Sequence, residues 1–395
     1  MKKLTKKSMS LLVALVFVLT AVIASVNVFA ANTVEKTLLP KKILTKAEKG
    51  VTTPAETFNF TATPHSFNGD TAQANKCKAL SAATVAYTTA DDTDADATKD
   101  GKQLTKAGSD MLDNVTFNEA GQYTYTIKET AGSTTGMTYS KAEYLASLFV
   151  VKKGSTFVVN NIMIKKTKND DGTDATGEKV PYDPSTLDSN GLAFNNVYDK
   201  KGGNPNPGKN DPQNPDTPNA DDKKGLVINK IVTGDDNFGG SFGFKLTLTA
   251  PKGATAGAIA SVPTAKIVDK AGNATPVTIN AYGTATEFQL KAGEKLVLND
   301  VLLGSTAMIE ETNAQGFNAS VSANGVDGAV TSLDTLKTTG IVLGDTGNGN
   351  NAAFTNTKQS ATGILLKNLP FIILGLVATA GIVLYVRGRA KKATE

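Results

Sequence analysis

The sequence predicts an all-β protein with two tandem β-sandwich domains, placed between an export signal and a membrane helix. Three observations favour this organisation. The chain of 395 residues is rich in Val, Thr, Gly, Asn and Asp, which suit strands and turns. Short runs alternate apolar and polar side chains, as half-buried strands do. A proline-rich segment in the middle of the chain separates two stretches that are each long enough to form a core.

The first 30 residues are typical of a secretory signal peptide. Lysines at the start precede an apolar stretch from Leu11 to Val26, and Val28-Phe29-Ala30 has the small residues that signal peptidase requires. An uncleaved membrane anchor is the alternative, but the apolar stretch is short for a span of about 20 residues. The segment therefore predicts export.

The first domain is expected over residues 31–198 and the second over 226–357. In the first, residues 123–129 read Tyr-Thr-Tyr-Thr-Ile-Lys-Glu, with an apolar side chain at every second position. In the second, residues 226–232 and 242–248 alternate in the same way. Polar, turn-rich loops separate these runs, a spacing that favours a β-sandwich.

Residues 199–225 form the predicted linker between the two domains. The segment contains almost no apolar side chains and holds five of the 14 prolines of the chain: Pro205, Pro207, Pro212, Pro215 and Pro218. Such a composition buries too little surface to fold alone and favours a semi-extended spacer.

The C-terminal end predicts membrane retention. Residues 364–386 form the predicted transmembrane segment, with an uninterrupted apolar stretch from Leu369 to Val386, and residues 387–395 form a basic tail. Cations that directly follow an apolar span keep their end in the cytoplasm. The region before the span is therefore expected outside the cell.

Charge and composition exclude several classes of function. Nine of the 41 basic residues and one of the 37 acidic residues lie outside residues 31–363, so this region carries a net charge of −4, whereas the whole chain carries +4. The only arginines, Arg387 and Arg389, are in the tail, which argues against nucleic-acid binding. A single Cys77 and a single His65 provide no disulfide, zinc site or hydrolytic dyad. We expect no metal and no cofactor.

One combination of residues occurs in both domains in the same order. In the second domain, Lys230 is on the same strand face as Ile228, Glu311 follows Ile309 by two positions, and Asn356 follows Phe354 by two. Side chains two apart in a strand point to the same face, so all three polar residues are predicted in the core. Glu310, the neighbour of Glu311, should point outward.

The first domain repeats this pattern with Lys42, Glu129 and Asn196. Lys42 precedes Leu44, Glu129 ends the inward row of residues 123–127, and Asn196 follows Phe194. Lys41 remains an alternative to Lys42, because the sequence does not fix which of the two faces the core.

These three residue types can form an intramolecular isopeptide bond. Burial disfavours charge, which lowers the pKa of a lysine and raises that of a glutamate. The neutral amine can then attack the side-chain carbonyl carbon of asparagine. A neutral carboxyl can polarise that carbonyl and transfer the protons that expel ammonia. The protein would perform one turnover on itself and none on an external substrate.

The sequence around these residues resembles the two-domain major pilin subunits of Gram-positive bacteria. The resemblance is carried by Lys230-Ile-Val-Thr-Gly234, Ile309-Glu-Glu311 and Phe354-Thr-Asn356, and in the first domain by Phe194-Asn-Asn196-Val-Tyr198. It implies two immunoglobulin-like (CnaB-type) domains. It also implies Lys42–Asn196 and Lys230–Asn356 crosslinks, with Glu129 and Glu311 as the catalytic residues.

Residues 359–363, Gln-Ser-Ala-Thr-Gly, with the span and tail after them, resemble the sorting signal of sortase substrates. The resemblance implies that a sortase cleaves between Thr362 and Gly363 and joins Thr362 to an amine. Lys179 is the candidate acceptor, because acceptor lysines of the family lie shortly before the last strand of the first domain.

The partners implied by the resemblance are the sortase, further copies of the chain, cell-wall peptidoglycan, and possible minor pilins and host ligands. The predicted protein is a shaft subunit of a cell-surface fimbrium anchored to the wall. The alternative is a monomeric, sortase-anchored adhesin that uses the same crosslinked domains as a stalk.

Overall fold

The structure is a computed structural model of the 395-residue chain. It describes residues 36–94, 96–98, 101–203, 225–234, 238–330, 335–345, 349–358 and 361–392. The predicted signal peptide therefore lies outside the described residues.

The first domain has two sheets that share one core. The first sheet has the order β4 (Asp96–Thr98), β5 (Gly101–Ala107), β1 (Lys41–Lys46), β11 (Ala193–Tyr198), β7 (Met137–Thr138). The second has the order β10 (Lys179–Val180), β9 (Thr156–Lys168), β8 (Glu143–Lys153), β6 (Gly121–Thr130), β2 (Glu56–Phe67), β3 (Ala83–Tyr87). Two short 3₁₀ helices complete the domain, η1 (Thr71–Lys76) and η2 (Thr89–Asp94).

The second domain also has two sheets. The larger has the order β15 (Ala274–Val277), β14 (Thr264–Val268), β17 (Lys295–Asn299), β12 (Leu226–Thr233), β22 (Asn351–Thr357), β19 (Asn318–Gly325), β20 (Gly328–Val330). The smaller has the order β16 (Thr286–Lys291), β13 (Ser241–Thr249), β18 (Thr306–Glu311), β21 (Ile341–Val342), and a short helix α2 (Ala256–Ala260) follows β13. The predicted all-β fold with two tandem sandwiches is confirmed.

In each domain the first and last strands are parallel neighbours. Strand β1 pairs with β11, with Leu44 opposite Asn196, and β12 pairs with β22, with Val232 opposite Asn356. Antiparallel strands can be joined by a short hairpin, whereas parallel neighbours need a long connection. A parallel pair therefore brings together segments that are distant in sequence. The chain ends of each domain therefore lie next to each other in one sheet.

The alternation of the sequence determines which side of each strand is buried. Strand β11 reads AFNNVY, and its second, fourth and sixth residues are buried. Phe194 packs against Phe60 and Tyr144 of the opposite sheet, with ring centroids 5.0 and 5.2 Å apart. Phe354 of β22 packs in the same way against Phe244 of β13, at 5.2 Å. These aromatic contacts surround the polar residues described below.

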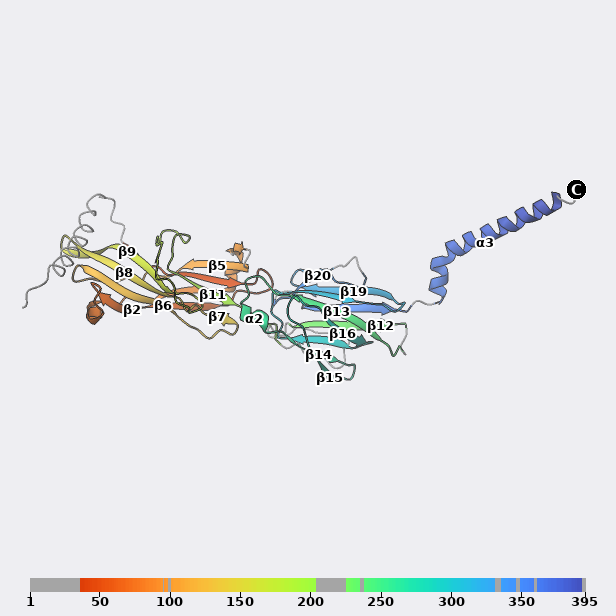
Figure 1. The fold of residues 1–395 in the computed structure, drawn as a ribbon, viewed down its shortest axis with the longest axis horizontal. Helices are drawn as coiled ribbons and strands as arrows, with labels where there is room; N and C mark the ends of the chain where they lie inside the picture. The colour runs from red at the N-terminus through yellow and green to blue at the C-terminus, as the bar shows by residue number, and fades with distance from the viewer. Residues whose placement is uncertain are drawn as a thin grey trace, which may run out of the picture.

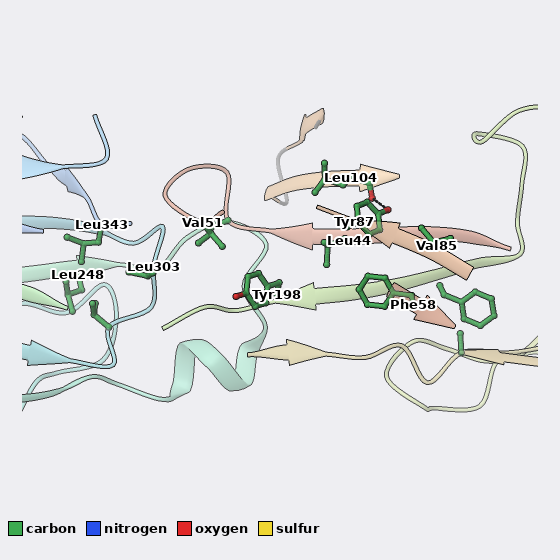
Figure 2. Packing of buried hydrophobic residues seen from close by; sticks show 14 of the residues in the cluster. Leu44, Val51, Phe58, Val85, Tyr87, Leu104, Tyr198, Leu248, Leu303 and Leu343 are labelled. Carbon is green, nitrogen blue, oxygen red and sulfur yellow. Dashed lines mark hydrogen bonds between the residues drawn. The ribbon is translucent and has the colours of Figure 1, made fainter. Parts of the chain in front are cut away.

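The two domains lie end to end and contact each other through ordered loops (Figure 1). Buried hydrophobic side chains continue from one core to the other, and Figure 2 shows Val51 and Tyr198 of the first domain on the side facing Leu303 and Leu343 of the second. The start of the predicted linker adds to this junction, because Gly202 N donates to Val301 O at 2.8 Å. Residues 204–224 of the linker lie outside the described residues.

Helix α3 (Ala361–Lys392) follows the second domain. Within the described part of the chain, it is the one helix that is long and apolar enough to cross a membrane, over Leu369–Arg387, with a mean hydropathy of 2.4 and none of this stretch buried. Its position is consistent with the predicted membrane anchor.

Candidate functional site

Three strands bring the predicted residues of the first domain together. Lys42 is on β1, Glu129 is near the end of β6 in the facing sheet, and Asn196 is on β11. Lys42 lies opposite Phe194 in the parallel pair, two positions before Asn196 along β11, so both polar side chains project from the same face. Lys42 Nζ lies 3.4 Å from Phe194 O of the neighbouring strand.

Glu129 bridges the other two side chains. Lys42 Nζ donates to Glu129 Oε2 at 2.7 Å, and Asn196 Nδ2 donates to Glu129 Oε1 at 2.6 Å. The side chains of Lys42 and Glu129 are fully buried. Lys42 Nζ also lies 4.5 Å from the centre of the Phe58 ring. One carboxyl group thus contacts both the amine and the amide nitrogen.

Burial changes the protonation of this pair in the direction that the chemistry requires. Desolvation lowers the pKa of Lys42 to about 8, although the nearby Glu129 carboxylate opposes this shift. Desolvation also raises the pKa of Glu129, against the opposing effect of Lys42. Both shifts lower the cost of moving a proton from the lysine to the glutamate.

The second domain builds a similar arrangement from β12, β18 and β22. Lys230 Nζ donates to Glu311 Oε1 at 3.1 Å and Oε2 at 3.0 Å, and Asn356 Nδ2 donates to Glu311 Oε1 at 2.6 Å. The lysine and glutamate side chains are fully buried, with Lys230 Nζ 4.2 Å from the centre of the Phe242 ring. Desolvation lowers the pKa of Lys230 to about 8.

The structure distinguishes the residues that the sequence left ambiguous. Lys42 has no exposed surface, whereas Lys41 is half-buried and its Nζ donates to Leu187 O at 2.9 Å near the surface. Glu311 is 1% exposed, while Glu310 lies on the outer face, 3.9 Å from Lys337. Lys42 and Glu311 are therefore the members that face each core.

The carbonyl oxygens of the two asparagines have different surroundings. In the first domain the backbone N–H of Ser140, in the loop between β7 and β8, donates to Asn196 Oδ1 at 2.7 Å. In the second domain Asn356 Oδ1 is buried and has no hydrogen-bond partner among the described residues. The sequence does not single out Ser140, because a backbone donor carries no residue-type signal.

The residues predicted for sortase chemistry lie away from both trios. Lys179 is exposed on β10, which pairs with β9 at the edge of its sheet. Thr362 and Gly363 are in the first turn of α3, after the last strand of the second domain. The structure does not bring Lys179 and Thr362 of one chain together. The predicted linkage does not require this, because it would join Thr362 of one copy to Lys179 of another.

The geometry of each trio suits an attack of an amine on an amide. The lysine is the nucleophile, the asparagine carries the carbon that is attacked, and the glutamate contacts both the attacking and the leaving nitrogen. The result would be a covalent link between the first and last strands of a domain, with release of ammonia.

Comparison with protein families gives one match in each domain. Residues 34–199 match the family described as the Spy0128-like isopeptide containing domain, and residues 224–358 match a family described as a domain of unknown function. None of the curated protein sequences matches the chain.

Three solved structures are among those that match the chain. The major pilin of Streptococcus pyogenes is 22% identical, over 83% of this chain and 99% of that chain, with a TM-score of 0.35. The T3.2 major pilin of the same species is 19% identical, over 82% and 99%, with a TM-score of 0.34. An adhesin of Mobiluncus mulieris that contains disulfide, isopeptide and ester crosslinks is 17% identical, over 77% and 85%, with a TM-score of 0.26.

Proposed function

We propose that the chain is the shaft subunit of a Gram-positive pilus, on the premise that residues 34–199 match the Spy0128-like isopeptide family. The observation that carries the proposal is the presence of two buried Lys–Glu–Asn trios in series, each between the first and last strands of a domain. Tension applied at the chain ends would then pass through covalent bonds.

In this proposal each domain forms its own crosslink without a cofactor. Lys42 bonds to Asn196 with Glu129 as the catalytic residue, and Lys230 bonds to Asn356 with Glu311. By analogy with a disulfide, closing a loop of more than 100 residues stabilises a domain by roughly 5 kcal/mol. A bond of this type needs no oxidising environment and no second cysteine.

Sortase chemistry would join the subunits. A sortase cleaves between Thr362 and Gly363 and transfers Thr362 to Lys179 of the next copy, or to peptidoglycan at the base of the fibre. A head-to-tail linkage that does not close produces a filament. The signal peptide and α3 serve export and retention before this transfer, and both are absent from the mature product.

Intact-mass measurement tests the crosslinks. The chain purified after signal cleavage should be lighter than its calculated mass by two molecules of ammonia. Lys42→Ala should restore one of them, whereas Lys41→Ala, a neighbouring lysine outside the trio, should not. Glu311→Ala should restore the other, with Glu310→Ala as its matched control. A wild-type mass equal to the calculated value would contradict the proposal.

Gel analysis of wall digests tests polymerisation. In a host with the cognate sortase, the wild-type chain should give a ladder of high-mass bands that resists boiling in detergent. Lys179→Ala should reduce the ladder to a monomer attached to the wall, while Lys165→Ala, which changes the residue paired with Lys179 on β9, should leave it unchanged. A single band for the wild type would favour a monomeric wall-anchored adhesin instead.

A further inference from the structure

The amide of Asn196 has a fixed orientation in the first domain. A backbone N–H can only donate, so the atom that faces Ser140 N at 2.7 Å must be the carbonyl oxygen Oδ1. The amide nitrogen then faces Glu129 Oε1 at 2.6 Å. The carboxyl group of Glu129 therefore contacts the leaving nitrogen, and a different donor contacts the oxygen on which charge develops.

Ser140 is held in place by contacts to Asp170 in the loop after β9. Ser140 Oγ donates to Asp170 Oδ1 at 2.6 Å, and Asn195 N, next to Asn196, donates to the same oxygen at 2.8 Å. Ala142 N donates to Ser140 Oγ at 3.1 Å. The Ser140 N–H and the Asn196 side chain are thus fixed relative to each other before any reaction begins.

We propose that the backbone N–H of Ser140 is an oxyanion donor for formation of the Lys42–Asn196 bond. This inference rests on the proposed isopeptide chemistry and adds a catalytic group that the trio does not contain. A donor already aimed at the oxygen stabilises the tetrahedral intermediate without reorganisation, and in other acyl transfers one such donor contributes roughly 100-fold or more in rate.

The proposed reaction balances with the groups present. Glu129 takes a proton from the Lys42 ammonium, and the free amine attacks Cγ of Asn196, which moves the carbonyl π electrons onto Oδ1 beside Ser140 N–H. The carboxyl then delivers a proton to Nδ2 and accepts one from Nζ. As the carbonyl re-forms, the Cγ–Nδ2 bond breaks and ammonia leaves. The products are a neutral amide, a protonated Glu129 and ammonia.

An open surface pocket borders the same site, and Glu129, Ser140 and Ala142 contribute to its lining. It provides a nearby exit for the ammonia. The second domain lacks the oxyanion donor, because Asn356 Oδ1 has no partner within the described residues. We therefore expect the first crosslink to form faster than the second in the same molecule.

The test follows both crosslinks during cell-free synthesis of the full chain. Samples taken over time are denatured, digested and analysed by mass spectrometry for the branched Lys42–Asn196 and Lys230–Asn356 peptides. Ser140→Pro removes the N–H, and Ser140→Gly is the matched control that keeps it. We expect Ser140→Pro to slow the first crosslink roughly 100-fold, and Ser140→Gly, which loses the same hydroxyl but keeps the N–H, to slow it much less. The second crosslink serves as the internal reference.

Proline also restricts the backbone, so a second variant covers the case in which Ser140→Pro does not fold. Incorporation of the α-hydroxy analogue of serine at position 140 converts the amide to an ester and removes only the N–H. A slowed first crosslink in this variant supports the proposal, and a wild-type rate overturns it. Absence of the Lys42–Asn196 peptide from the wild-type chain would instead contradict the proposed function.

Discussion

A lysine and a glutamate with no exposed surface are costly to bury as ions. The proposed isopeptide bond would remove this cost, because the amine would become part of a neutral amide and the carboxyl would keep the proton. Under this proposal the buried charge is temporary, and the covalent product would suit the apolar core better than the folded precursor does.

The titration of Lys42 predicts that the stability of the first domain depends on pH in a variant that cannot form the crosslink. Asn196→Ala leaves Lys42 as an amine whose pKa burial lowers to about 8, against 10.5 in the unfolded chain. Between these values the unfolded state binds more protons, so the stability of the domain rises with pH. We expect the free energy of unfolding to increase between pH near 7 and pH near 10 by at most roughly 2 kcal/mol, because the raised pKa of Glu129 acts in the opposite direction.

Guanidinium denaturation followed by circular dichroism measures this change, and the second domain, which keeps its proposed Lys230–Asn356 crosslink, provides a constant reference. The double variant Asn196→Ala, Lys42→Met removes the titrating amine and should lose the increase. If both variants gave the same pH profile, Lys42 would not be the buried group that titrates.

At the scale of the strands, the parallel pairing of β1 with β11 and of β12 with β22 positions the lysine and the asparagine of each trio relative to each other. Lys42 lies opposite Phe194 and Lys230 opposite Phe354, so in both domains the asparagine is two positions beyond the residue opposite the lysine. The period of two in the sequence was enough to predict that Lys230, Glu311 and Asn356 share the core. It did not predict the strand order, which depends on contacts between distant segments.

Burial of a lysine on the inner face of the first strand is not sufficient to predict that it forms an isopeptide bond. Lys46 follows Lys42 and Leu44 on the inner face of β1 and is only 3% exposed. Its Nζ lies 2.5 Å from Asp92 Oδ1 and also donates to Val51 O, so its partners are a carboxylate and a backbone carbonyl. The alternating pattern places Lys46 on the inner face of β1 as well as Lys42. The facing strand β6 distinguishes them, because its Glu129 contacts Lys42.

The sequence could not predict Ser140 or the domain junction for a related physical reason. The group at position 140 that contacts Asn196 is a backbone N–H, which every residue except proline carries. The junction depends on loops whose side chains are ordinary polar residues in the sequence, such as Thr52 and Asp345. Strands in which apolar and polar residues alternate, and long apolar segments, leave a recognisable pattern in the sequence. A single contact between two loops does not.

At the scale of the whole molecule, the junction holds the two domains in line (Figure 1). Asp345 of the second domain is central to it, because Thr52 N and Thr52 Oγ1 donate to its Oδ1 at 3.0 and 2.9 Å, and Lys200 Nζ lies 2.6 Å from its Oδ2. The backbones also approach closely at Gly50, where a Cβ atom would lie 2.5 Å from Leu343 O. A subunit that transmits tension benefits from a junction of this kind, since a flexible hinge would extend before the crosslinked domains bear load.

Substitution of Asp345 should therefore loosen the junction without affecting either crosslink. Asp345→Ala leaves the Thr52 donors and the Lys200 ammonium without their carboxylate, and we expect the free energy of local opening to fall by about 2–3 kcal/mol. Hydrogen exchange of the full chain in detergent measures this at the amide of Gly202, which donates to Val301 O across the junction and does not contact Asp345. Asp327→Ala is the matched control, because Asp327 crosses the same junction to Lys49 through an ion pair at 3.3 Å in which both side chains are more than half exposed. Such a pair contributes at most about 1 kcal/mol. Equal exchange in the two variants would mean that the close backbone contacts, and not Asp345, hold the domains in line.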